Sequence, residues 1–420
     1  MARLKFGRYD YAAFWMFIAY AVASVAVPVV LVNMARDLHF ALEEEGGMVA
    51  GGWLQMLRSV SVCVAMALCV FLSARYGNRR PLGFATVLIG VGMLCCVIAP
   101  NYAVLIVALA FAGFGEGVIE GLATPFVQEN HHEEPGRYIN FSHGFWSVGV
   151  LVATLLFGFM LVQGVSWRWV LVVAGLFAVP GLWLALVKSR RASLPPSELH
   201  STSVPAREIF RRAAEAAKLP RFWLFYGAMF LAGGGEFCLT FWVASFIQLN
   251  FAGSAMLGGA GTAIFALGMF LGRIGSGFLV PHKYLRHLIV AMGIFATAVS
   301  AVIPHLGTLT PNASNASILI LFFIVLFLAG IGTAPFWPSI QSYAVDCLPK
   351  LDTTMLFVLL SCAGIPGCGF FTLLMGYVGN AWGLAVSFYL VPACFAVMTG
   401  LVFLASVKKG HQYPVGIKAR

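Results

Sequence analysis

The sequence contains few charged residues. Only 10% of its 420 residues are Asp, Glu, Lys or Arg, and 60% are hydrophobic. An ordinary soluble domain has about 25% charged residues. A soluble chain of this length could not hide so much apolar surface from water, and the composition also excludes disordered and coiled-coil proteins. The sequence therefore predicts a protein surrounded by lipid.

Signatures of nucleotide binding and catalysis are also missing. The phosphate-binding pattern G-x-x-x-x-G-K-[ST] does not occur, and no Ser/His/Asp or metal-ligand constellation is evident. The nine cysteines fall in or at the ends of apolar stretches, without the spacing of a metal site or a disulfide framework. We therefore expect no enzyme activity, no cofactor and no metal site.

Long apolar stretches occupy most of the chain. A bilayer core about 30 Å thick needs roughly 20 apolar residues per helix. Twelve stretches meet this requirement: 11–34, 48–73, 81–99, 103–127, 139–162, 169–187, 222–249, 256–280, 288–306, 316–344, 355–378 and 382–406. They are too long and unbroken for the strands of a barrel. We expect an all-α integral membrane protein with twelve transmembrane helices in two pseudo-symmetric six-helix bundles.

One long polar segment, from Lys188 to Arg221, divides the spans into six and six. It predicts an N-terminal bundle over 1–187, a basic cytoplasmic linker over 188–221, and a C-terminal bundle with a short cytoplasmic tail over 222–420. Residues 206–218 fit either a basic amphipathic helix at the membrane surface or a solvated linker.

The net charge of +10 has a topological explanation. With the N-terminus inside, nearly all Lys and Arg residues lie in cytoplasmic segments; only Arg36 and Arg168 fall outside, and Arg58 lies within a span. This asymmetry matches the positive-inside rule. It predicts a multi-pass protein of the cell membrane, in contact with lipid and with both termini in the cytoplasm, and it requires no nucleic acid.

Two motifs carry a family resemblance. After the second span, residues 74–80 (A-R-Y-G-N-R-R) resemble the D-R-x-G-R-R loop of the major facilitator superfamily. The fourth and tenth spans share a P-x-x-Q core, at 125–128 and 338–341, as expected for two related halves. Membership of this superfamily implies a secondary transporter that works by alternating access on a small-molecule substrate.

A narrower resemblance is to the fucose–proton symporter branch and related sugar porters. Residues 120–127 (E-G-L-A-T-P-F-V) resemble the fourth span of that branch, in which a glutamate precedes N-P-F-V. Similar positions follow in the fifth span at Arg137, Asn140, His143, Phe145 and Gly149, and in the seventh span at Gly234, Glu236 and Trp242. Ser24 stands where the branch has a first-span aspartate, so the resemblance implies that proton coupling would depend on Glu120 alone.

Ionisable residues inside the predicted spans are the main candidates for function, because a charge at the bilayer centre costs at least about 2.5–3.5 kcal/mol. Glu116 and Glu120 are four residues apart and share one helical face. One of two carboxyl groups in a dry site is expected to hold a proton, which suits proton coupling. Alternatively, one of them only pairs with Arg58. Arg58 itself could form an ion pair or bind a substrate anion.

Further candidates for substrate binding surround these charges. Glu236 follows Gly233–Gly235, a run that would loosen a helix. His143 is a candidate because histidine side chains ordinarily titrate near physiological pH, although a histidine near the interface is often only hydrogen-bonded. Trp146, Trp242 and Trp337 could stack on a sugar or another ring, whereas most of the other aromatic residues must face lipid or pack.

Together these features predict a secondary active transporter, and we expect it to be monomeric. The leading hypothesis is transport of a small polar, sugar-like solute with a proton, or a sodium ion, as the coupling ion. An organic anion bound by Arg58 is the alternative. Drug efflux is less favoured, because residues 144–150 (G-F-W-S-V-G-V) lack the Gly-Pro and Gly-Gly of drug–proton antiporters.

Overall fold

The chain folds into helices that satisfy their own backbone groups, as lipid requires. The computed structural model describes residues 5–131, 135–183, 206–308, 316–351 and 353–407, and no strand occurs in them. The first half contains α1 (Arg8–Asp37), α2 (Gly47–Tyr76), α3 (Arg79–Val97), α4 (Tyr102–Asn130), α5 (Pro135–Val162), α6 (Trp167–Leu176) and η1 (Val179–Gly181). The second half contains α10 (Pro220–Asn250), α11 (Ala255–Leu279), η3 (His282–Tyr284), α12 (Leu285–Ser300), α13 (Val302–Thr308), α14 (Ala316–Thr333), α15 (Phe336–Cys347), α16 (Thr353–Trp382), α17 (Leu384–Ser387) and α18 (Leu390–Val407).

Eleven segments of the described chain are long and apolar enough to cross a membrane, which confirms the all-α membrane fold. The predicted sixth span, 169–187, is represented by the shorter apolar segment Trp167–Gly181, and residues 184–187 lie outside the described chain. The predicted tenth span, 316–344, is not one continuous helix. It breaks between α14 and α15 at Ala334 and Pro335, because proline lacks the backbone N–H that would continue the helix.

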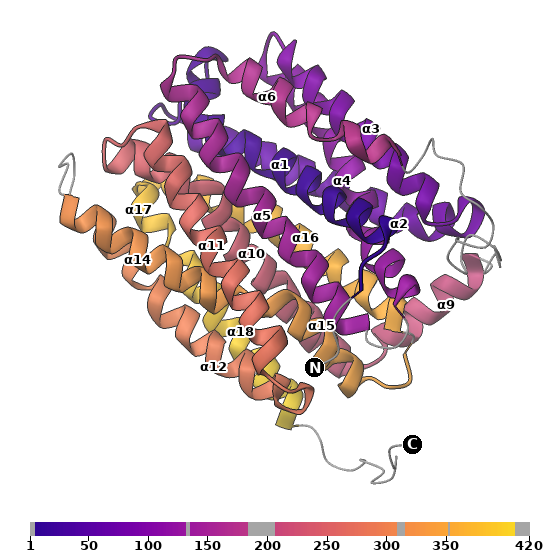
Figure 1. Cartoon of the computed structure of the whole chain (residues 1–420). Coiled ribbons are helices and arrows are strands. Elements are labelled where there is room, and N and C mark those ends of the chain that lie inside the picture. Colours follow the sequence, from indigo (N-terminus) through magenta and orange to yellow (C-terminus); the bar gives the residue numbers. More distant parts are fainter. Residues whose placement is uncertain (1–4, 132–134, 184–205, 309–315, 352, 408–420) are drawn as a thin grey trace.

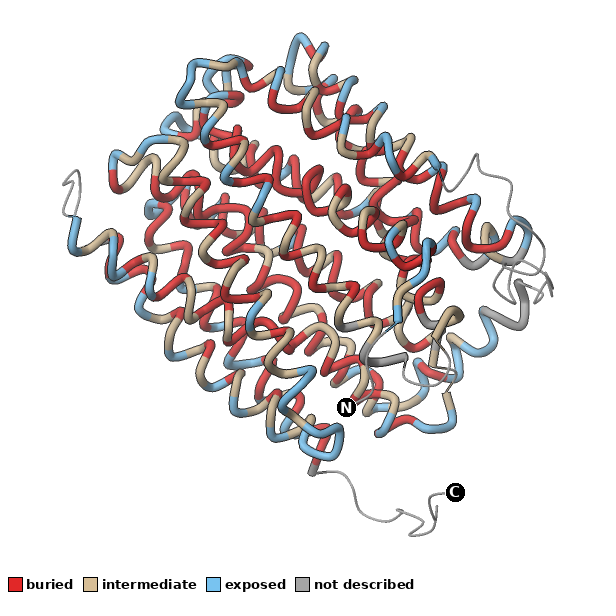
Figure 2. Tube along the Cα trace, in the orientation of Figure 1, coloured by how far each residue is buried: buried red, intermediate tan, exposed pale blue. Residues whose placement is uncertain are grey.

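The two halves lie side by side, indigo to magenta and salmon to yellow in Figure 1. They meet where α2 packs against α16 and α5 packs against α11, and α1 also contacts α10. In α1 and α10, 83% of the most apolar stretch is buried, against 33–61% in the other spans. These two helices therefore form the centre of the bundle, as the buried residues in Figure 2 show.

At each end of the bundle, hydrogen bonds join residues that are distant in the sequence. At one end, the amide of Gly46 at the start of α2 donates to Asn380 Oδ1 of α16 (2.7 Å). At the other end, Asn78 donates to Glu129 Oε1 (2.9 Å), and Arg221 donates to the carbonyl oxygen of Cys347 (3.4 Å). We call the first the Asn380 end and the second the α9 end, because α9 (Ala206–Ala217) leads into α10 there.

α9 occupies most of the segment 206–218, for which the sequence fits either a helix or a solvated linker. Phe210 is 68% exposed, and Arg211 and Arg212 beside it are also exposed. Arg211 forms an ion pair with Glu215 one turn later (3.5 Å). Whether this helix lies on the membrane surface stays a prediction, as do the domain boundaries at 187 and 221, since residues 184–205 lie outside the described chain.

The interface between the halves is closed toward the Asn380 end by close backbone contacts. A Cβ atom on Gly376 of α16 would lie 2.5 Å from the carbonyl oxygen of Met48 on α2, well inside contact distance. Gly52 of α2 is similarly placed, since a Cβ atom at that position would lie only 2.8 Å from Cα of Leu373. Only glycine therefore allows the two helices to approach this closely.

Replacing Gly376 by alanine is expected to destabilise this closed interface by about 1–3 kcal/mol, the usual cost of overpacking. Thermal denaturation of the purified protein measures the effect. Gly275→Ala on α11 is the matched control, because no atom lies within 4 Å of a Cβ placed there. Equal stability of the two variants would contradict the close contact.

Candidate functional site

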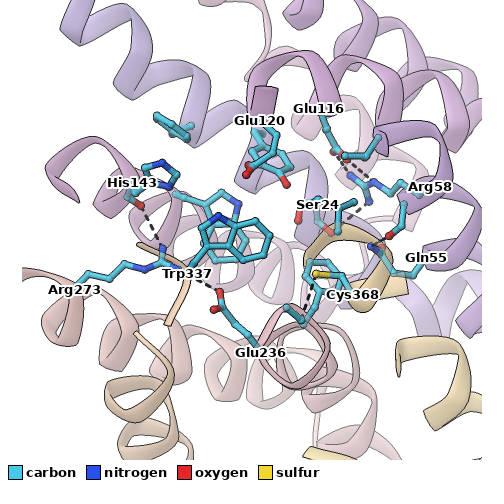
Figure 3. A pocket seen from close by; sticks show the side chains of 18 residues that line it. Ser24, Gln55, Arg58, Glu116, Glu120, His143, Glu236, Arg273, Trp337 and Cys368 are labelled. Carbon is cyan, nitrogen blue, oxygen red and sulfur yellow. Dashed lines mark hydrogen bonds and ion pairs between the residues drawn. The ribbon is translucent and has the colours of Figure 1, made fainter. Parts of the chain in front are cut away.

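A cavity of about 70 Å³ lies between the two halves, near the middle of the bundle. Its walls come from both halves, and Figure 3 shows their polar side chains pointing toward one another. The lining residues are Phe17, Tyr20, Ser24, Gln55, Arg58, Ser59, Val62, Glu116, Glu120, His143, Trp146, Gly233, Glu236, Phe237, Arg273, Trp337, Ile365 and Cys368. Such a cavity can hold a few water molecules but is smaller than the pockets of about 300–1,000 Å³ that enclose small-molecule ligands.

The first charged pair in the cavity wall joins α2 to α4. Arg58 donates from Nε to Glu116 Oε2 (2.8 Å) and from Nη2 to Glu116 Oε1, so the pair is bidentate. Arg58 also donates from Nη1 to the carbonyl oxygen of Ser24 on α1 (3.4 Å). Arg58 and Glu116 are each only 2% exposed. The carboxylate that pairs with Arg58 is therefore Glu116, and the pair ties three helices of the first half together.

The second charged pair joins α11 to α10. Arg273 donates from Nη2 to Glu236 Oε1 (3.2 Å), and both residues are buried. Arg273 also donates from Nη1 to Ser147 Oγ (3.2 Å) and to the carbonyl oxygen of His143 (3.4 Å), both on α5. This arginine therefore bonds to both halves of the protein.

Glu120 lies between the two pairs (Figure 3) and differs from the other two cavity glutamates. No arginine or lysine of the described chain forms an ion pair with it within 4.0 Å, and part of its surface stays open to the cavity. Ser361 of α16 is a neighbour of this carboxyl group, and its Oγ accepts from Gln341 Nε2 (3.0 Å). Glu120 thus has a carboxyl group in the cavity that forms no ion pair with an arginine of the described chain.

Aromatic side chains form much of the remaining wall. Trp146 lies beside Arg273, with the guanidinium carbon 5.7 Å from the ring centroid, within the range of a cation–π contact. The His143 ring lies 4.7 Å from that of Phe17 and shares a 2.9 Å hydrogen bond with Thr124 Oγ1. The cavity therefore combines flat apolar faces with a few polar groups, as small-molecule sites generally do.

A smaller cavity of about 20 Å³ adjoins the first on the side of the α9 end. Glu120, His143 and Trp337 line both cavities. The other walls of the smaller one include Gln341 and Phe357, near the α9 ends of α15 and α16. Glu120 therefore stands at the junction between the central cavity and the space that leads toward the α9 end.

Seven of the eight residues predicted for the site line the central cavity, and Trp242 does not. Trp242 is fully buried, and its indole N–H donates to the carbonyl oxygen of Thr372 (3.1 Å). Its ring also packs beside Gly51 of α2. This side chain fills the contact between α10, α16 and α2 and not the cavity wall, and the expected substrate contact of Trp242 stays a prediction without support from the cavity. The side chains of Arg137 and Asn140, named in the family resemblance, lie outside the described part of the chain.

Trp242→Phe tests whether this side chain packs between helices or binds the substrate. The variant keeps an aromatic ring but loses the hydrogen bond to Thr372, and we expect it to lower the free energy of unfolding by about 1 kcal/mol. Affinity for a bound ligand should not change. Thermal denaturation and a ligand titration measure the two quantities, with Trp337→Phe as the control that alters the cavity wall. A large loss of affinity in Trp242→Phe alone would contradict this assignment.

Eleven lining residues are not among the eight predicted for the site, and Arg273, Tyr20 and Gln55 have the largest polar side chains among them. The sequence identifies Arg273 as an ionisable residue near the end of a predicted span and also includes it among the basic residues of the cytoplasmic side, so it predicts no role for Arg273 in the site. Its position among small residues, G-R-I-G-S-G, is a signal that another helix approaches it closely. Tyr20 and Gln55 carry no charge, and nothing in the sequence separates them from other polar residues in the spans.

The fold and the central cavity define a polytopic membrane carrier built from two packed helical halves. The profile of the Major Facilitator Superfamily matches residues 12–320, so the chain belongs to this superfamily. Its members are transporters and not enzymes, and this chain is accordingly a secondary transporter.

Solved structures of this superfamily share the fold at low sequence identity. A crystal structure of the E. coli fucose:proton symporter FucP is 18% identical, with a TM-score of 0.63, and covers 94% of this chain and 98% of its own. FucP in the outward conformation is 16% identical with a TM-score of 0.64, covering 94% and 98%. A bacterial homolog of the human lysosomal transporter Spinster, in an inward-facing and occupied conformation, is 16% identical with a TM-score of 0.69, covering 97% and 98%.

Proposed function

We propose that this transporter carries a small polar, sugar-like solute together with a proton, and that Glu120 is the proton carrier. The proposal rests on the ion-pair partners of the three glutamates in the cavity. Glu116 and Glu236 each have an arginine partner, whereas Glu120 has none within the described chain. A carboxyl group without a fixed counter-ion can bind and release a proton without breaking an ion pair.

The charge balance of the cavity favours a neutral solute. Two arginines and three glutamates line it, so the wall carries one net negative charge when Glu120 is ionised and none when Glu120 is protonated. A proton therefore neutralises the site for an uncharged solute. Gln55, Ser24 and Ser59 can hydrogen-bond hydroxyl groups, and Trp146 and Trp337 offer flat faces on which a sugar ring can stack.

An organic anion is the second candidate, favoured by the presence of two buried guanidinium groups in one cavity. An anion would have to displace Glu116 from a bidentate pair or Glu236 from a single bond. No observation on the described chain favours drug efflux. Sodium in place of the proton is a further outcome that transport measurements would separate.

We infer that the structure represents a state closed at the end that faces the outside of the cell. The interface is closed at the Asn380 end, and the smaller cavity extends toward the α9 end. Basic residues of the described chain gather at the α9 end, whereas the two arginines of the other end, Arg36 and Arg168, form ion pairs with Glu43 and Asp37. By the positive-inside rule the α9 end faces the cytoplasm. We expect the protein to act as a monomer in the cell membrane.

A thermal-shift screen of the purified protein tests the substrate class. The panel contains L-fucose and other neutral sugars, simple carboxylates such as lactate and succinate, and hydrophobic cations as drug probes. Stabilisation by neutral sugars, followed by uptake into proteoliposomes under an inward proton gradient, is the expected result. Stabilisation by carboxylates alone would establish the second candidate. Uptake driven by a sodium gradient and unaffected by pH would overturn proton coupling.

A further inference from the structure

The helix α9 lies across one end of the bundle, crosswise to the spans (Figure 1). The backbone of Leu219 is extended and Pro220 begins α10, so the chain changes direction between the two helices. The indole N–H of Trp223, in the first turn of α10, donates to the carbonyl oxygen of Ala217 at the end of α9 (2.8 Å). Trp223 is 54% exposed. Exposed tryptophans at the ends of spans lie among lipid headgroups, so this bond holds α9 at the level of the headgroups.

One side of α9 presents an apolar stripe that the protein does not cover. Phe210, Ala214 and Ala217 are spaced four and three residues apart, so they share one side of the helix. All three are exposed. Arg211 and Lys218 are exposed too, and their spacing of two helical turns places both along one edge of the stripe. Apolar residues beside basic ones are the pattern of helices that lie in a membrane interface.

The apolar stripe is too small to hold α9 on a neutral lipid surface. It contains one phenylalanine and two alanines, and binding at an interface depends on buried apolar area together with attraction between charges. The segment 206–221 carries five basic and two acidic residues. A basic segment next to a span is attracted to the negative surface of the cytoplasmic leaflet, and the attraction grows with each Lys or Arg. Anionic lipid therefore supplies the contribution that the stripe lacks.

We propose that α9 is a docking site for anionic lipid, with Phe210 inserted between the headgroups and Arg211 and Lys218 bound to lipid phosphate groups. Both side chains are phosphate ligands in other proteins. Arg211 also pairs with Glu215 (3.5 Å), but an exposed pair of this kind contributes little, so a phosphate can replace the carboxylate. Because α9 leads into α10, lipid contact fixes the cytoplasmic end of a central helix. This inference is independent of the solute and of Glu120.

Hydrogen–deuterium exchange of the full-length protein in lipid nanodiscs tests the proposal. A helix of 12 residues is marginal in water, so the exchange of its amides reports whether a surface holds it. One set of discs contains phosphatidylcholine alone, and the other contains phosphatidylcholine mixed with phosphatidylglycerol. We expect amides 206–217 to exchange about tenfold more slowly in the anionic discs, an effect within reach of two or three basic residues. Salt at about 1 M, where the Debye length is about 3 Å, should remove the difference.

Two double variants with the same loss of charge identify the residues responsible. In Arg211→Gln, Lys218→Gln the ratio of exchange rates between the two kinds of disc should fall to about twofold or less. Lys283→Gln, Lys350→Gln is the matched control, because both lysines are exposed and lie at the same end of the bundle, and it should keep the full ratio. The ratio compares two lipids within one variant, so a change in the stability of the helix itself cancels.

Glu215→Gln tests the sign of the effect. It removes a negative charge from α9 and should enlarge the ratio, and a smaller ratio would contradict the proposal. A ratio near one in the wild type, or a ratio that salt leaves unchanged, would overturn it, as would equal losses in the two double variants. Slow exchange in both kinds of disc at every salt concentration would show instead that the protein itself holds α9.

Discussion

Proteoliposomes containing Glu120→Gln are expected to show no uphill accumulation of the transported solute under a proton gradient, with the internal-to-external ratio falling to about one. The coupled solute can be concentrated only if the carrier binds the proton and the solute together. Glutamine keeps the size of the side chain and one acceptor oxygen, but it cannot carry a proton. Exchange of labelled for unlabelled solute should therefore continue at a reduced rate.

The matched control is Glu43→Gln. Glu43 is an exposed glutamate that pairs with Arg36 at the Asn380 end, far from the cavity. This variant loses the same charge and should accumulate solute as the wild type does. Undiminished accumulation by Glu120→Gln would show that another group carries the proton, and loss of both accumulation and exchange would indicate a role in solute binding instead.

The helical membrane fold could be predicted from the sequence because hydrophobic length alone determines it. Eleven predicted spans have counterparts in the described chain. The break at Pro335 shows the limit of this argument. A hydropathy profile does not register the missing backbone N–H of a proline, so it predicts one continuous helix for the tenth span.

The composition of the candidate site was largely predictable, but its pairing was not. Buried charges are rare enough in lipid that Arg58, Glu116, Glu120 and Glu236 stand out from the sequence. Helical spacing places Glu116 and Glu120 on one face but cannot decide which of them meets Arg58. That choice depends on the relative depth and rotation of α2 and α4, which are set by packing between helices.

Arg273 and Trp242 differ from expectation in opposite ways for the same reason. Arg273 lies near the end of its span, which predicts a place in a loop, although its side chain faces the cavity. Trp242 follows Glu236 in the same helix, which predicts a place in the cavity, although its side chain faces α2 and α16. In both cases the sequence indicates the position along the helix but not the direction in which the side chain points.

Breaking the Arg58–Glu116 pair is expected to have the largest effect on stability. In Glu116→Gln the buried guanidinium, 2% exposed in the wild type, loses its carboxylate partner. Removal of one partner of a buried ion pair costs about 3–5 kcal/mol. The free energy of unfolding, measured by denaturant titration in mixed micelles, should fall by this amount. Arg36→Gln is the control, because exposed ion pairs contribute about 0–1 kcal/mol.

The double variant Arg58→Met, Glu116→Leu then separates the two roles open to Arg58. Apolar residues of similar size can replace a buried ion pair with little loss of stability, so we expect this variant to recover most of the loss in Glu116→Gln. If the pair only connects α1, α2 and α4, the double variant should also bind the solute with nearly normal affinity. A stable double variant that no longer binds the solute would instead make Arg58 a ligand group and favour an anionic substrate.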